Sequence, residues 1–246
     1  MELDEYARIA AVEDEHWWYR STRAVMADLL GPWLGANQTI LDAGCGPGGN
    51  GAWLARHGQV AALDLAPEGL RFVRDRRPEL EPLRGNVTAL PFPDGRFDIA
   101  VAVTVVYSVS RDDRAVAELA RVLRPGGVLL LVEPAFRALR RAHDKTVARV
   151  HRYRRRELAA LAVGAGLTVQ RATYAYSFLT PPAAALSLAD RLRPRAVSAA
   201  GSDVERRWLD RLFEPLARLE RRRLRRGDVP FGTSVIVVAT RPMSGA

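Results

Sequence analysis

The sequence of 246 residues predicts an α/β fold built on a doubly wound, mainly parallel sheet. Between residues 39 and 134, short apolar runs alternate with helical patterns, which is typical of that fold class. The run at 99–105 is continuously apolar, as expected of a central parallel strand that is buried on both faces. A glycine-rich turn at 44–49 joins the first apolar run to a helical pattern. Such a turn is typical of the ligand-binding end of a parallel sheet.

Residues 1–36 are predicted to form an N-terminal helical lid, with helices over 3–12 and 17–34. Apolar residues of the second helix recur mostly at helical spacing, and the helix is predicted to end near Gly31-Pro32 or Gly35. It begins in the aromatic sequence His-Trp-Trp-Tyr at 16–19. Neighbouring side chains on a helix point in different directions, so one ring can pack on the core while another covers a ligand. Packing alone explains these aromatic residues equally well.

The first strand, at 39–41, leads directly into the glycine-rich turn. Glycines lack a Cβ, so the backbone of this turn can adopt positive φ and its N–H groups can approach a ligand closely. About 20 residues downstream, Asp64 closes a second apolar strand, where a ribose diol would lie in a βαβ unit. By spacing alone, a nicotinamide dinucleotide and S-adenosylmethionine both fit, because Gly44-x-Gly46-x-x-Gly49 also satisfies the dinucleotide pattern.

Asp42, two residues before the first glycine, separates the two cofactors. Its carboxylate would repel a pyrophosphate but attract the ammonium and sulfonium groups of S-adenosylmethionine. The sequence Asp42-Ala-Gly44-Cys-Gly46-Pro-Gly48 resembles the first motif of the class I S-adenosylmethionine-dependent methyltransferases, which reads acid-x-Gly-x-Gly-x-Gly. Residues 90–98 and 118–127 resemble the same family, so the resemblance covers about 39–134. It implies a Rossmann-like fold and methyl transfer from that cofactor.

The other elements follow in chain order. The patterns predict a helix at 51–57, a strand at 59–63, a helix at 67–76, a strand end near 83–87, the strand at 99–105, a helix at 111–123 and a strand at 128–132. Pro67 suits a first helical turn, and the sequence Arg-Pro-Gly-Gly at 124–127 ends the preceding helix. The resemblance implies a sheet of seven strands that finishes in an antiparallel hairpin, for which 168–173 and 234–240 are the apolar candidates.

The resemblance also implies which residues contact the cofactor. Family members usually carry an acid that binds the adenine amino group where this chain has Asn86, and an amide oxygen can still accept that bond. An N-terminal helix commonly folds over the cofactor in related enzymes. The predicted contacts are Asp42, Gly44, Cys45, Gly46, Gly48, Asp64, Leu65, Asn86, Val87, Thr104, Tyr19 and Arg23.

The acceptor side follows the strand at 128–132. His143-Asp144 and His151 lie there, and a helix is predicted to open at 151 and run to 165. An imidazole can take a proton from an acceptor at neutral pH, and a carboxylate can orient it. Asp144 and His151 are about two helical turns apart, so a direct pair requires a bend. The predicted catalytic residues are His151, Asp144 and Tyr107, while packing or capping by His151 and ordinary packing by Tyr107 stay open as alternatives.

The predicted organisation places the cofactor-binding domain at 37–176, a helical cap insertion at 177–229, and the final strand and tail at 230–246. The cap encloses an acceptor in this interpretation; simple packing and a dimer contact are the alternatives. The basic run at 221–226 fits either a solvated helix end or a contact with a membrane surface or an anionic, lipid-linked acceptor.

Composition excludes several classes of protein. No apolar run reaches the roughly 18 residues of a membrane span, the acidic start does not resemble a signal peptide, and Cys45 is the sole cysteine. We therefore expect a cytoplasmic monomer or homodimer without a metal site. The net charge is +9, but in most segments the basic residues are interspersed with acidic ones, a pattern that does not favour binding to nucleic acid.

The predicted function is methyl transfer to an oxygen, nitrogen or carbon of a small-molecule acceptor. The alternatives are a nicotinamide-dependent oxidoreductase and a non-catalytic protein that binds S-adenosylmethionine.

Overall fold

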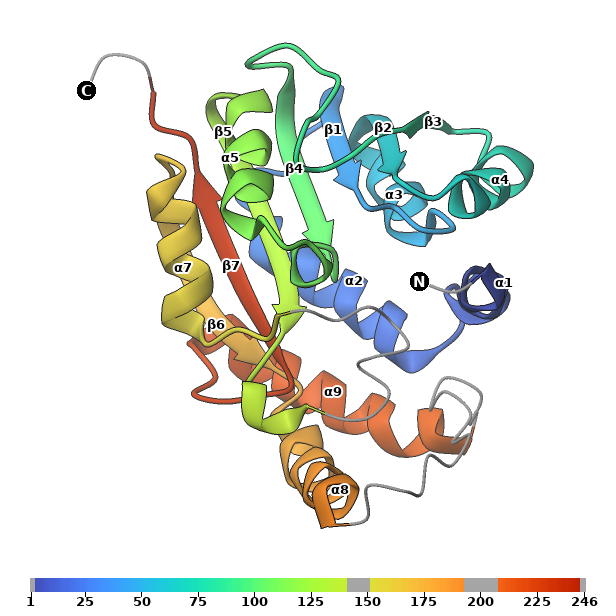
Figure 1. Cartoon of the computed structure of the whole chain (residues 1–246), viewed down its shortest axis with the longest axis vertical. Coiled ribbons are helices and arrows are strands. Elements are labelled where there is room, and N and C mark those ends of the chain that lie inside the picture. The colour runs from blue at the N-terminus through green and yellow to red at the C-terminus, as the bar shows by residue number, and fades with distance from the viewer. Residues whose placement is uncertain (1–2, 141–150, 193–207, 244–246) are drawn as a thin grey trace.

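The computed structural model describes residues 3–140, 151–192 and 208–243 (Figure 1). Within these ranges the strands form one seven-stranded sheet in the order β3-β2-β1-β4-β5-β7-β6. The first five strands pair in parallel, whereas β7 is antiparallel to both β5 and β6. The predicted sheet and its final hairpin are therefore confirmed. The strands are β1 (Gln38–Ala43), β2 (Gly58–Asp64), β3 (Leu80–Arg84), β4 (Phe97–Val103), β5 (Leu123–Pro134), β6 (Thr168–Ala175) and β7 (Ser234–Thr240).

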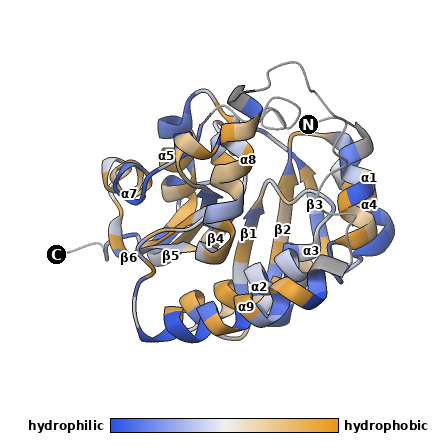
Figure 2. Ribbon diagram, turned by 90° about the horizontal axis from the view of Figure 1, so that it is seen from below, coloured by the Kyte–Doolittle hydropathy of each residue, from blue (hydrophilic) through white to orange (hydrophobic). Residues whose placement is uncertain are grey.

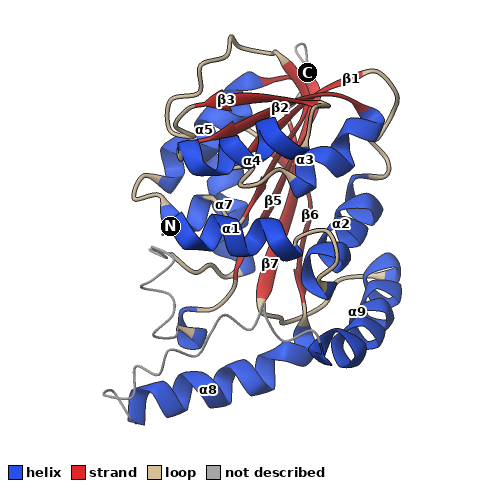
Figure 3. Ribbon diagram, turned by 90° about the vertical axis from the view of Figure 1, so that its right-hand side faces the viewer, coloured by secondary structure: helices blue, strands red, loops and turns tan. Residues whose placement is uncertain are grey.

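Helices cover both faces of the sheet (Figure 3). The apolar residues of α5 and α7 join the core on one face, and those of α2, α3, α4 and α9 join the core on the other. The helices are α1 (Leu3–Val12), α2 (Trp17–Leu30), α3 (Gly49–Leu54), α4 (Pro67–Arg76), α5 (Asp112–Val122), α7 (Arg155–Gly164), α8 (Thr180–Leu192) and α9 (Trp208–Arg226). Short 3-10 turns are η1 (Ala55–His57), η2 (Val106–Ser108), η3 (Arg137–Leu139) and η4 (Ser177–Leu179).

The central strand β4 shows why this sheet is double-sided. Ala100 and Ala102 lie in the core under α5 and α7, and Ile99 and Val101 lie in the core under α2 and α9. All four are fully buried, so the apolar run has no polar face. The order of the strands reverses between β1 and β4, and a ligand of an open α/β sheet binds at the carboxyl ends on either side of that point.

The second half of the predicted cap insertion belongs to the main layers of the fold. Ala217 and Leu224 of α9 are buried in the core with α2, so α9 covers the sheet. In α8, the buried Ser187 places its Oγ 2.9 Å from the carbonyl oxygens of both Ala138 and Arg140. This contact fixes α8 to the segment that follows β5. A role of α8 over the acceptor stays a prediction.

The second helix ends at Leu30, so the first of its two predicted ends, near Gly31-Pro32, is confirmed. The start of another predicted helix is wrong. The helix predicted from 151 begins at Arg155, because Tyr153 forms an isolated parallel bridge with Ala135. The amide of Tyr153 donates to the Pro134 carbonyl at 2.9 Å. Residue 151 therefore lies outside the helix. His143 and Asp144 lie outside the described residues.

Candidate active site

The glycine turn after β1 is folded tightly against β2. The amides of Gly44 and Cys45 both donate to the Leu63 carbonyl, at 2.6 and 2.9 Å. Gly44, Gly46 and Gly48 have φ of 75°, 54° and 97°, a region that favours glycine. A Cβ on Gly44 would lie 2.3 Å from Val105, whereas a Cβ on Gly46 would meet no atom within 4 Å. Gly46 therefore faces the open side of the turn, where a ligand can approach its backbone.

Asp64 joins the two turns that follow β1 and β2. Its Oδ2 accepts from the Gly46 amide at 2.9 Å, and its Oδ1 accepts from the Ala66 amide at 2.9 Å. The Tyr6 hydroxyl, from α1, donates to Oδ1 at 3.4 Å. Only 8% of Asp64 is exposed, while the next residue, Leu65, exposes 62%. A carboxylate beside an exposed apolar side chain suits a ribose next to an adenine ring.

Asp42 is a buried carboxylate with an unused oxygen. The residue is 1% exposed, and its Oδ2 forms no hydrogen bond within the described part of the chain. Burial, together with the nearby charges of Asp64 and Glu13, raises the pKa of Asp42 to about 7. A cationic ligand would stabilise the ionised form of Asp42 and so offset the cost of burying its charge. The site therefore fits the ammonium and sulfonium groups of S-adenosylmethionine better than a pyrophosphate.

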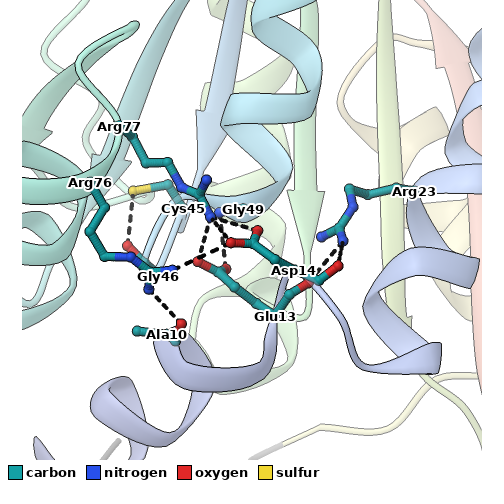
Figure 4. A network of polar contacts seen from close by, with 9 residues as sticks. All are labelled: Ala10, Glu13, Asp14, Arg23, Cys45, Gly46, Gly49, Arg76 and Arg77. Carbon is teal, nitrogen blue, oxygen red and sulfur yellow. Dashed lines mark hydrogen bonds and ion pairs between the residues drawn. The ribbon is translucent and has the colours of Figure 1, made fainter. Parts of the chain in front are cut away.

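The turn after α1 lies over the glycine turn (Figure 4). The buried Glu13 accepts from the Gly49 amide at 3.0 Å and pairs at 3.4 Å with Arg77, the residue that follows α4. Asp14 also pairs with Arg77, at 2.6 Å, and with Arg76 at 3.3 Å. Sequence reasoning missed Glu13 because nothing local marks this acid as distinct from its neighbours. Burial raises the pKa of Glu13, and the Gly49 amide and Arg77 oppose that effect.

Both predicted lid residues reach this region from α2. The Nη2 of Arg23 donates to the carbonyl oxygens of Glu13 and Asp14, at 2.8 and 3.4 Å (Figure 4). Its buried Nη1 has no hydrogen-bond partner among the described residues, which leaves a donor for a ligand carboxylate. The pKa of Tyr19 is raised, first by burial and then by the charge of Glu13; Tyr107 adds a smaller effect. The neighbouring Trp17 instead packs in the core. The packing role of this aromatic segment is therefore confirmed for Trp17, and the lid role of Tyr19 stays a prediction.

The turn after β4 is held by a buried acid that the sequence did not reveal. Thr104 has φ of 55°, an uncommon conformation for a residue branched at Cβ. The Glu133 carboxylate, fully buried at the end of β5, accepts from the amides of Val105, Val106 and Tyr107 at 3.2, 2.9 and 3.2 Å. These bonds fix the strained turn beside the carboxyl end of β1. Thr104 and the residues that follow it in this turn are therefore held in one position.

The structure does not support the predicted acceptor role of Asn86. Its Oδ1 accepts from both the amide and the hydroxyl of Thr88, each at 2.9 Å. Both lone pairs of this oxygen are used by the local turn, so none is left for an adenine amino group in this conformation. The adjacent Val87 is buried, with 7% of its surface exposed, and stays a predicted adenine contact.

The thiol of Cys45, in the glycine turn, is also buried. Burial raises the pKa of this thiol, so it is not a reactive nucleophile.

His151 lies close to two of the residues that surround the acceptor side. Its amide donates to the Tyr107 carbonyl at 2.8 Å, and its Nδ1 lies 4.0 Å from Oδ2 of Asp112. The Tyr153 hydroxyl donates to the same Oδ2 at 2.9 Å, and its ring stacks on the imidazole. The Nε2 of His151 is buried and has no hydrogen-bond partner in the described ranges. Asp112 is therefore a carboxylate beside His151 that sequence reasoning missed, while Asp144 lies outside the described residues.

The sequence model of the family described as Methyltransferase domain matches residues 41–131. This stretch contains Asp42, the glycine turn, Asp64 and the strained turn after β4. Residues 41–131 of this chain are therefore a methyltransferase domain of that family. The cofactor of this methyltransferase domain is therefore S-adenosylmethionine, as the carboxylate at position 42 predicted. Glu133 and His151 lie beyond the matched stretch.

Two relatives and one solved structure are similar to this chain. A fatty-acid O-methyltransferase of Mycolicibacterium smegmatis is 39% identical over 120 residues, 47% of this chain and 41% of the relative. An uncharacterised 37.1 kDa protein in transposon TN4556 of Streptomyces fradiae is 35% identical over 219 residues, 78% of this chain and 62% of the relative. The fold is shared with a solved chain from the complex between the Haloferax volcanii Trm112 methyltransferase activator and a methyltransferase. The TM-score is 0.64 at 20% identity, and the match covers 97% of this chain and 98% of the solved chain.

The methyltransferase chain thus spans less than two thirds of the length of these curated relatives. Within the described ranges, none of its helices combines the length and apolar character needed to cross a bilayer. The same ranges hold no group of three or more His, Cys, Asp or Glu side chains that could bind a metal ion.

Proposed function

We propose that this protein transfers the methyl group of S-adenosylmethionine to a small-molecule acceptor. The observation that carries the proposal is the group of carboxylates around the open glycine turn. Asp64 and Glu13 raise the pKa of Asp42 there, and Asp42 keeps a buried oxygen without a partner among the described residues. Such a site favours a ligand with two positive groups and disfavours a pyrophosphate.

Each part of the cofactor has a candidate partner in this chain. Asp64 would hold the ribose hydroxyls, and Leu65 and Val87 would flank the adenine. Asp42 and the backbone from Gly44 through Cys45 and Gly46 to Gly48 would hold the methionine end. Arg23 Nη1 would bind its carboxylate, with Tyr19 and Thr104 lining the space between. When bound, the cofactor supplies an electrophilic methyl carbon.

The contribution of the chain to the reaction is mainly placement. The Tyr6 and Glu13 contacts of α1 and its following turn shield the site from water, and Glu133 fixes the turn that presents Tyr107. Holding two reactants in line is worth roughly 7 to 11 kcal/mol relative to free encounter. We further propose that His151 removes a proton from the acceptor and that Asp112 stabilises the protonated ring. The pKa of Tyr153 is raised by burial, by Glu133 and by Asp112, so its hydroxyl stays protonated and donates to Asp112.

For the acceptor we propose a lipid-like small molecule with an oxygen, nitrogen or carbon nucleophile. Support comes from the similarity to a fatty-acid O-methyltransferase and from the position of the base candidate outside the matched domain, where relatives can differ. A lipid-linked acceptor would also suit the basic run at 221–226. The cytoplasmic location and the monomeric or homodimeric state remain predictions.

Calorimetric titration and a transfer assay test this function together. Titration with S-adenosylmethionine, S-adenosylhomocysteine and NAD should give binding of the first two compounds only. Transfer of a labelled methyl group to fatty acids, isoprenoid quinols and aromatic amines should then identify the acceptor class. Binding of NAD in place of S-adenosylmethionine would favour an oxidoreductase, and tight cofactor binding without transfer would favour a non-catalytic protein. A co-crystal with S-adenosylhomocysteine would show the shape of the acceptor cavity.

A further inference from the structure

One flank of α9 carries apolar and basic residues that do not pack on the rest of the fold. Leu212, Leu216 and Leu219 recur at intervals of four and three residues and expose 54%, 38% and 64% of their surface. The same spacing continues through Arg223 and Arg226, so all of these side chains share one side of the helix. We call these residues and the adjacent Arg222 the α9 stripe.

The α9 stripe is not needed to attach the helix. Ala217, Glu220 and Leu224 lie on the neighbouring side of α9 and are buried. The Glu220 carboxylate accepts from the amides of Tyr176 and, at 2.6 Å, Ser177. The buried side therefore provides both apolar contacts and hydrogen bonds to the body of the protein. The leucines of the stripe stay in contact with water.

The arginines of the stripe also differ from the other arginines of the helix. Arg218 pairs with Glu214 at 2.6 Å, and both Arg221 and Arg225 pair with Asp28 of α2, at 2.5 and 3.0 Å. In contrast, Arg222, Arg223 and Arg226 are exposed and form no ion pair with a side chain that the structure describes. Their positive charge is therefore available to a partner of opposite charge.

We propose that the α9 stripe binds an anionic lipid surface, with its leucines in the headgroup region and its arginines on the lipid phosphates. A helix at the rim of the molecule that mixes strongly hydrophobic with strongly hydrophilic residues suits such a contact (Figure 2). A nucleic acid would use the arginines but leave the leucines in water. A second copy of the chain fits poorly, because parallel pairing places arginine against arginine and antiparallel pairing places leucine against arginine. The inference does not depend on the methyl-transfer reaction.

Co-sedimentation of the full-length protein with vesicles tests the proposal. The protein should bind vesicles that contain about 30 mol% phosphatidylglycerol and not vesicles of phosphatidylcholine alone, and salt should weaken the binding. Changing Arg222, Arg223 and Arg226 together to Gln should weaken binding about 100-fold, because each contact contributes about fivefold. Changing Leu216 and Leu219 together to Asp should weaken it at least about tenfold.

A matched control changes Arg71, Arg74 and Arg156, which are exposed on α4 and α7, to Gln. This variant loses the same charge and should still bind as the wild type does. Thermal unfolding checks that each variant is folded. The proposal is overturned if the wild type does not bind anionic vesicles. It is also overturned if the control loses as much affinity as the Arg222, Arg223 and Arg226 variant, or if the aspartate variant binds as tightly as the wild type. Dimerisation that the aspartate variant abolishes, without vesicle binding, would assign the stripe to a contact between copies.

Discussion

The imidazole of His151 lies beside the carboxylate of Asp112, with 4.0 Å between Nδ1 and Oδ2. The two residues come from different elements: Asp112 begins α5, and His151 precedes α7 in an extended segment. The backbone of the same histidine is bonded to Tyr107. The pair therefore connects the turn after β4 to the segment after β5, and these are the two segments expected to flank an acceptor.

His151→Ala should lower turnover about 10²- to 10⁴-fold and leave the affinity for S-adenosylmethionine unchanged, if the histidine is the base. Asp112→Asn should lower turnover less, since the ring is still present but its protonated form is no longer stabilised. Steady-state kinetics with the true acceptor measures both. Full activity of His151→Ala would return this residue to a packing role.

Asp64→Ala should weaken binding of S-adenosylmethionine at least about tenfold, because charge-assisted hydrogen bonds to the ribose, each of about 1.5 to 3 kcal/mol, are lost. The glycine turn should also loosen, since the Gly46 amide loses its acceptor. Calorimetric titration measures the affinity. Asp75→Ala, which changes an exposed carboxylate on α4, serves as the control and should bind normally. Wild-type affinity in Asp64→Ala would contradict the assignment of the ribose site.

The pKa of about 7 for Asp42 predicts two effects of pH. An aspartate in the unfolded chain ionises near pH 4, so between about pH 4 and 7 the folded protein holds an extra proton, and stability falls as pH rises through that window. Asp42→Asn should remove this loss and be more stable than the wild type at about pH 8 by roughly 2 to 4 kcal/mol. Urea unfolding at both ends of the window measures the difference.

The second effect concerns cofactor affinity. A cationic cofactor favours the ionised carboxylate, so binding to the wild type should tighten as pH rises toward 8, and binding to Asp42→Asn should be weaker and independent of pH in this range. Parallel pH profiles of the two proteins would argue against Asp42 as the group that meets the cationic end.

Arg77→Ala should speed the release of S-adenosylhomocysteine about tenfold. The guanidinium pairs with Glu13 and Asp14 and so ties the turn after α1 to α4. Its loss leaves the buried Glu13 without a cationic partner, which should favour an open lid. Stopped-flow displacement measures the release rate. Arg74→Ala, an exposed arginine of the same helix, should release product at the wild-type rate.

Glu133→Ala should destabilise the protein by about 3 kcal/mol or more, because three buried amides lose their acceptor and the strained turn at Thr104 loses its support. Glu133→Gln keeps one carbonyl oxygen and should retain part of that stability. Denaturant unfolding ranks the variants. A Glu133→Ala protein as stable as the wild type would show that the turn is fixed by packing alone.

The cofactor side of the site could be predicted because its chemistry follows short spacings. The strand, the glycine turn and the acid at the end of the next strand all lie within one βαβ unit, and the pattern of apolar residues fixes which strand ends meet. Gly46 and Asp64 were accordingly identified from the sequence and are bonded to each other. The seven-stranded sheet followed from the same patterns and the family resemblance.

The remaining residues depend on tertiary contacts that no local pattern marks. Glu13 lies 36 positions from Gly49, and Tyr153 lies 41 positions from Asp112. Asp112 was not considered as a partner of His151, because the two residues are 39 positions apart and only the fold brings them together. Asn86 was assigned by resemblance, but the local turn uses its oxygen.

The position of β7 has a consequence for how the chain is made. β7 follows the other strands in the chain, yet it lies between β5 and β6 and pairs with both. During synthesis one edge of β5 therefore has unpaired backbone groups until residues 234–240 have left the ribosome. Until then β6 also lacks the strand with which it pairs. The nascent protein is most exposed to aggregation in that interval, and a chaperone that shields the β5 edge would act there.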